Sequence, residues 1–188
     1  MIIAVGESLI VAGTAVAGDS RTAPLVGVAV AALAVAGLMW WSYFGWLHQS
    51  LEHGLASVSP ARMGSAARDA FSLSHFPLIC GIVGFAVAVE EFVAHPDEPA
   101  SGAVIGALGV GVALFVGFSA VAYWYFYRRV LVARLVALAV MGALLFVAAP
   151  LAPVVSLTAV AITLLALVLL EGRSADLHHP VAGSVRPG

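Results

Sequence analysis

Three titratable residues lie in or beside long apolar segments of the chain: Glu7, Glu90 and His75. Glu7 falls inside the first such segment, where a carboxylate must find a partner, a proton or water. Glu90 lies near the end of the third segment, on a face that would let it point inward with Glu7. His75 immediately precedes that third segment, and its imidazole titrates near neutral pH. The three residues are therefore candidates for a proton or ion relay.

Each candidate also has a simpler reading. Glu7 would then be a protonated or hydrogen-bonded carboxyl that only holds two helices together. His75 would be a helix-start histidine without a special role. Glu90 is followed by the acidic residues Glu91, Asp97 and Glu98, which together form either a cation-attracting rim or a solvated loop.

Other chemistry finds little support in the sequence. His48 and Glu52 are four residues apart, as two metal ligands on one helical face would be, but no further ligand accompanies them. Cys80 is the single cysteine, so no disulfide can form within the chain. The sequence contains no nucleophile motif, phosphate-binding glycine loop or nucleic-acid signature. We therefore predict no metal site, no cofactor, no enzymatic activity and no nucleic-acid partner.

The composition is that of an integral membrane protein. Of the 188 residues, 62% are hydrophobic and only 10% are charged, and the mean hydropathy is +1.07. Such a chain cannot surround its core with a polar shell in water. Its expected surroundings are a lipid bilayer.

Six apolar segments predict an all-α bundle of about six transmembrane helices. They span residues 2–17, 24–46, 76–93, 102–127, 130–148 and 154–170. The first is short for a bilayer core that needs roughly 17 to 25 residues per helix. Pro150 and Pro153 predict a tight turn between the last two segments. We expect residues 1–172 to form the bundle and residues 173–188 to form a disordered cytoplasmic tail.

The arginines predict the orientation. Arg62 and Arg68 fall between the second and third segments, and three more, Arg128, Arg129 and Arg134, fall at the junction of the fourth and fifth. Arg173 and Arg186 lie in the tail. Short arginine-rich connections stay in the cytoplasm, so both termini are expected there, in a multi-pass protein of a bacterial inner membrane. Aromatic clusters that end the second and fourth segments agree with this interface.

Glycine spacing predicts which helices pack closely. Gly81 and Gly84 lie in the third segment, and Gly102, Gly106 and Gly111 lie in the fourth. Small residues at these spacings let two helix backbones approach each other. The third and fourth segments should therefore be closely packed within the bundle.

Four short motifs carry a family resemblance. They are Val-Gly-Glu-Ser at 5–8, Trp-Trp-Ser-Tyr-Phe at 40–44, Ser-His-Phe-Pro-Leu at 74–78, and Glu-Glu at 90–91 followed by Ala-His-Pro-Asp at 94–97. In this order and spacing they resemble the bacterial low-temperature-requirement A (LtrA) family. The resemblance implies a multi-span bacterial membrane protein linked by its name to growth in the cold.

The chain departs from the family pattern in two ways. Gly45 stands where members usually carry an Asp, and the chain resembles only the C-terminal half of longer members. Either the start is truncated, or a second copy or another chain supplies the missing helices. The leading hypothesis is a transporter of protons or small ions that uses Glu7, Glu90 and His75. The alternative is a non-transporting accessory or cold-stress protein in which Glu7 has a structural role.

Overall fold

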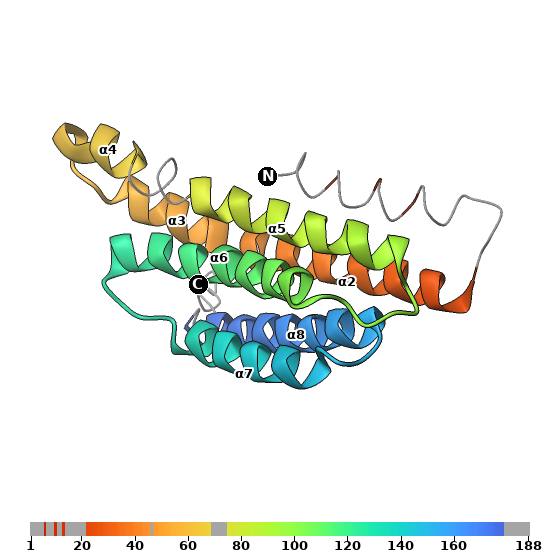
Figure 1. The fold of residues 1–188 in the computed structure, drawn as a ribbon. Helices are drawn as coiled ribbons and strands as arrows, with labels where there is room; N and C mark the ends of the chain where they lie inside the picture. The colour runs from red at the N-terminus through yellow and green to blue at the C-terminus, as the bar shows by residue number, and fades with distance from the viewer. Residues whose placement is uncertain are drawn as a thin grey trace.

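A computed structural model gives the arrangement of the helices. It describes residues 22–45, 47–68 and 75–178, together with the single positions 6, 10 and 13. The described part of the chain is all-helical, and most of its helices run side by side in a bundle (Figure 1). The largest fully buried apolar side chains in its core include Phe85, Phe92, Phe115 and Met39.

Four helices are long and apolar enough to cross a membrane. They are α2 (Ala23–Phe44), α5 (His75–Ala94), α6 (Gly102–Tyr127) and α8 (Pro153–His178). The predicted second, third, fourth and sixth segments are thereby confirmed as membrane-compatible helices. The protein is a membrane helical bundle. The predicted first segment lies outside the described residues, apart from positions 6, 10 and 13.

The fifth predicted segment forms a shorter helix than expected. Helix α7 (Val132–Ala148) has 17 residues, about 26 Å at 1.5 Å per residue, which falls short of a full hydrocarbon core. It packs against α6 and α8, and its first turn carries a buried charge described below. The helix is short because the connection after α6 occupies the first two residues that the sequence assigned to it.

Local chemistry sets the helix boundaries. Thr22 caps α2 by accepting a hydrogen bond from the backbone N–H of Leu25, and Pro24 follows in the first turn. Ser101 caps α6 in the same way through the N–H of Val104. The predicted proline turn is confirmed, because α7 ends at Ala148 and α8 begins at Pro153. Helices α7 and α8 thus form an antiparallel hairpin.

The glycine spacing predicted close packing of both α5 and α6, and the structure shows that the two helices pack backbone against backbone on each other. A Cβ added to Gly81 would lie 2.5 Å from the carbonyl oxygen of Gly111, and one added to Gly111 would lie 2.7 Å from the carbonyl oxygen of Gly81. Gly102 and Gly106 have open space at the Cβ position, so they take no part in this contact. The close approach is therefore limited to the middle of the two helices.

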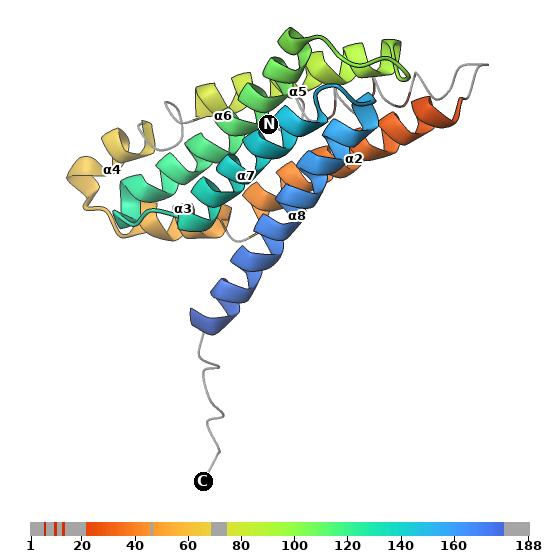
Figure 2. The same ribbon diagram turned by 60° about the horizontal axis from the view of Figure 1, so that its bottom comes forward.

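Two short helices extend the bundle beyond the end of α2, and the first of them lies beside the last turns of α6. Helix α3 (Leu47–Ala56) buries Leu47, Leu51 and Gly54, whereas α4 (Pro60–Ala67) is almost entirely exposed and projects from the same end of the bundle (Figure 1). At the other end of the chain, α8 continues to His178 (Figure 2). It therefore runs past residue 172, where the sequence placed the end of the bundle.

A long-range hydrogen bond helps to hold α3 against the end of α6. The Tyr127 hydroxyl donates to the Ser50 carbonyl oxygen at 2.7 Å. Tyr127→Phe should weaken this docking by about 0.5 to 1.5 kcal/mol, the usual net value of one hydrogen bond. Amide hydrogen exchange should then be faster in α3 and unchanged in α5. Equal exchange in wild type and variant would mean that apolar contacts alone hold α3.

Candidate functional site

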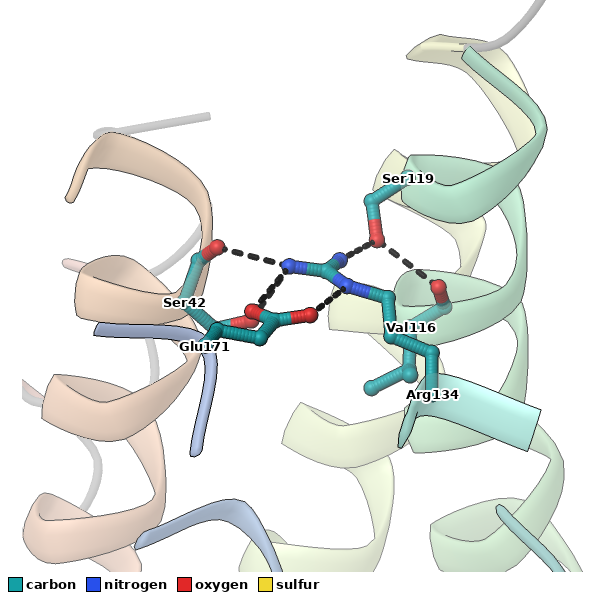
Figure 3. A network of polar contacts seen from close by, with 5 residues as sticks. All are labelled: Ser42, Val116, Ser119, Arg134 and Glu171. Carbon is teal, nitrogen blue, oxygen red and sulfur yellow. Dashed lines mark hydrogen bonds and ion pairs between the residues drawn. The ribbon is translucent and has the colours of Figure 1, made fainter. Parts of the chain in front are cut away.

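The most unusual feature of the bundle is a buried ion pair between α7 and α8. Arg134 is fully buried and Glu171 is 6% exposed. The guanidinium Nε donates to Glu171 Oε1 at 2.7 Å, and Nη2 donates to Oε2 at 2.9 Å (Figure 3). This is the parallel two-bond geometry in which arginine holds a carboxylate most firmly.

Two further helices contribute acceptors to the same guanidinium. Nη2 also donates to the carbonyl oxygen of Ser42 in α2 at 3.0 Å and reaches its Oγ at 3.3 Å. Nη1 donates to Oγ of Ser119 in α6, whose own hydroxyl donates to the Val116 carbonyl at 2.8 Å. Arg134 thus ties α2, α6, α7 and α8 together at one point (Figure 3).

The placement of Arg134 corrects the sequence interpretation, which treated it as one of the arginines at the membrane surface. Ser119 lies eight residues before the end of α6, about 12 Å along the helix axis. The four-residue link 128–131 can span about 13 Å when extended, so it can carry the chain back to the depth of Ser119 before α7 begins. Arg134 therefore lies inside the bundle, while Arg128 and Arg129 remain exposed.

The pair is chemically demanding in this position. A charged side chain in the middle of a membrane helix costs about 2.5 to 3.5 kcal/mol on insertion scales, and a buried pair offsets this only with good geometry and full hydrogen bonding. Both conditions are met here.

The structure does not bring the three predicted relay residues into one site. Glu7 lies outside the described residues. Glu90 is exposed, on the same side of α5 as the exposed Val83 and Val87. It therefore does not point into the core that the described helices form, and its expected orientation toward Glu7 stays a prediction. His75 begins α5 and Glu90 lies 15 residues later, about 22 Å along the axis.

His75 nevertheless lies close to the residues around the ion pair. Its Nε2 is 3.5 Å from the hydroxyl of Tyr43, and the two rings meet edge to face at 5.7 Å. Tyr43 is buried and follows Ser42, which accepts from Arg134. The last turn of α2 therefore contacts Arg134 through Ser42 and His75 through the next residue, Tyr43.

The candidate metal residues form a simple helical pair. His48 Nε2 lies 3.4 Å from Glu52 Oε1, and the His48 ring stacks on Tyr43 at 6.1 Å. Among the described residues, no group of three or more His, Cys, Asp or Glu side chains could hold a metal ion. The contact resembles the i,i+4 pair of Glu91 and His95 at the opposite end of the bundle.

One signal in the sequence could have found the ion pair. Residues at similar distances from a tight turn face each other in a helical hairpin, and the predicted proline turn fixes that comparison. Arg134 lies 14 residues before the end of α7, and Glu171 lies 18 residues after the start of α8. The remaining offset is about 6 Å of helix, which an arginine side chain can bridge.

A comparison with known families agrees with the membrane bundle and with the motifs in the sequence. No curated protein and no solved structure matches the chain. The model of the family described as bacterial low temperature requirement A protein matches residues 1–169, nearly the whole chain and all of the apolar segments. The chain belongs to the bacterial low temperature requirement A (LtrA) family.

Proposed function

We propose that this LtrA protein is a multi-pass protein of the bacterial inner membrane that moves protons or another small cation, with the Arg134–Glu171 pair as its central gate. The pair is the observation that carries the proposal. Ionisable residues inside a membrane bundle are rare and commonly mark ion or proton pathways. An apolar pair of similar volume would hold two helices together as well or better, so stability alone gives little reason for two charges here.

The surroundings of the pair support a gate. Arg134 contacts α2, α6 and α8 at once, so loss of the Glu171 charge would loosen three helix contacts together. His75 lies at the same end of the bundle and touches Tyr43, the residue after Ser42. In this proposal His75 exchanges protons with the aqueous side, and Glu171 takes the role of the inward carboxylate. Glu7 and Glu90 stay candidates for the remaining path.

The distribution of arginine supports the inner-membrane orientation. Arg62, Arg68, Arg128 and Arg129 are exposed at the end of the bundle where α2 and α6 finish. The positive-inside rule assigns this end to the cytoplasm. His75 and the ion pair then lie nearer the cytoplasmic side.

Proton flux into liposomes tests the proposal directly. The purified protein is reconstituted, a pH gradient is imposed, and flux is read with a pH-sensitive dye. The decisive variant is Arg134→Met/Glu171→Met, which removes both charges and leaves neither unpaired. We expect it to fold and to show only the flux of protein-free liposomes. Wild-type flux in this folded double variant would eliminate the pair as the gate.

Matched variants separate the individual roles. Arg173→Gln changes an exposed charge two residues beyond Glu171 on the same helix, and its flux should equal that of the wild type. Glu7→Gln tests the relay predicted from the sequence. If it abolishes flux while the folded fraction is unchanged, Glu7 belongs to the same path as the ion pair.

A second candidate function is a non-transporting accessory protein, favoured by one observation. The guanidinium of Arg134 is already engaged by two carboxylate oxygens and two serines, as in a purely structural cross-link. In that case the wild-type protein itself should carry no more flux than empty liposomes, with protons or with other small cations.

A further inference from the structure

The exposed charges of the described residues are separated between the two ends of the bundle. One end carries the exposed arginines at positions 62, 68, 128, 129 and 173, and Glu52 is the one exposed carboxylate whose side chain is described there. The other end carries Glu90, Glu91, Asp97 and Glu98, with no arginine in the described part. The first end is therefore a positively charged rim on a membrane protein.

Arg128 and Arg129 form the best-defined part of this rim. Arg128 ends α6 in a left-handed conformation with φ 52°, and its N–H donates to the carbonyl of Trp124. Its guanidinium carbon lies 4.6 Å above the centre of the Trp124 ring. The conformation and the ring contact hold the charge of Arg128 against the end of α6, beside the exposed Arg129.

Apolar side chains lie directly beside these charges. Val130 is 58% exposed and Val132 is 64% exposed, while Trp124 is 43% exposed. Exposed valines next to exposed arginines suit the boundary between acyl chains and headgroups, where tryptophan also prefers to lie. The link 128–131 thus has an apolar side and a cationic side within four residues.

Helix α4 extends the same rim. It leaves Arg62 and Met63 exposed and projects from the end of the bundle at which α6 finishes, as both views of the fold show (Figures 1 and 2). It is carried by α3, which α6 holds through Tyr127 and Phe126. Arg62 in α4 and Arg68 at its C-cap therefore come from a different part of the chain and lie at the same end of the bundle as Arg128 and Arg129.

We propose that this rim, formed by Arg62, Arg68, Arg128 and Arg129 with Trp124, binds the headgroups of anionic phospholipids. The rim lies at the ends of membrane-spanning helices, so lipid phosphates are the anions at its level. A guanidinium can bind a phosphate by donating two parallel hydrogen bonds to its oxygens. Clusters of four or more basic residues beside a membrane helix attract anionic lipid. The inference is independent of whether the protein moves ions.

Lipid binding to the whole protein in detergent tests this inference. Phosphatidylglycerol or phosphatidylcholine is titrated into the purified protein, and bound lipid is counted by native mass spectrometry. We expect phosphatidylglycerol to bind more tightly than phosphatidylcholine. Each replacement of an arginine by glutamine should weaken the binding of phosphatidylglycerol about five-fold. Arg128→Gln/Arg129→Gln should therefore lose about 25-fold, and added salt should reduce the wild-type preference.

Two controls make the result decisive. Glu90→Gln/Glu91→Gln raises the net charge by the amount that the arginine variant lowers it, but at the opposite end, and its affinity should be that of the wild type. Arg128→Lys/Arg129→Lys keeps the charge without the fork and should bind between the wild type and the glutamine variant. Equal binding of the two lipids, or wild-type binding by Arg128→Gln/Arg129→Gln, overturns the proposal. Complete competition by inorganic phosphate at equal concentration would overturn it as a lipid site.

Discussion

Arg134→Met is expected to lower the free energy of unfolding by about 3 to 5 kcal/mol, because it leaves the carboxylate of Glu171 buried without its partner. Glu171→Met should have a similar effect by leaving the guanidinium unpaired. Unfolding in mixed micelles, followed by circular dichroism, measures both changes. The effect is large because Arg134 also serves Ser42 and Ser119, so its loss removes contacts to three other helices.

The double variant separates the contribution of the pair from the cost of a lone charge. Arg134→Met/Glu171→Met should be at least as stable as the wild type, since apolar residues of similar volume commonly replace a buried pair without loss. Arg173→Gln, on the exposed side of α8, should change stability by less than about 0.5 kcal/mol. A double variant whose loss of stability equals the sum of the losses in the two single variants would show that the residues contribute separately.

Gly81→Ala is the second change with a large expected effect, about 3 kcal/mol of destabilisation. Its new Cβ would lie 2.5 Å from the Gly111 carbonyl oxygen and 2.8 Å from the Phe115 backbone nitrogen. Both are backbone atoms, so no side-chain rotation can relieve the overlap. The same mixed-micelle unfolding measures the loss, and a crosslink between α5 and α6 would detect their separation.

Gly106→Ala is the matched control on α6. Nothing lies within 4 Å of the position of its Cβ, so the alanine should stabilise the helix by about 0.5 to 1 kcal/mol. Opposite signs for the two substitutions are the result that the packing predicts. Equal, small effects would mean that α5 and α6 are not in backbone contact at Gly81.

Most of the fold could be predicted because each membrane helix is marked by a long apolar segment of the sequence. Length and hydropathy alone identify α2, α5, α6 and α8, and the proline positions identify the α7–α8 turn. The glycines mark α5 and α6 as closely packed helices, but they do not say that the two pack on each other. The start of α7 and the end of α8 were missed for a common reason. Neither boundary has a strong local signal in the sequence.

The candidate site was much harder to predict from the sequence. Arg134 follows Arg128 and Arg129, so it is interpreted as a third interfacial charge. Glu171 directly follows the sixth apolar segment, which ends at residue 170, so nothing in the sequence marks it as buried. Their burial depends on how far the link 128–131 returns toward the bundle. The face on which Glu90 lies was also not predictable, because helical periodicity alone does not say which face of α5 meets α6.

The backbone contact between α5 and α6 should make the two helices move as one rigid unit. They cannot slide past each other, because each glycine carbonyl lies where the other helix has no side chain. His75 is the first residue of α5, and Ser119, which accepts a hydrogen bond from Arg134, lies on α6. A tilt of α5 at His75 would thus carry α6 with it and displace Ser119 beside the ion pair.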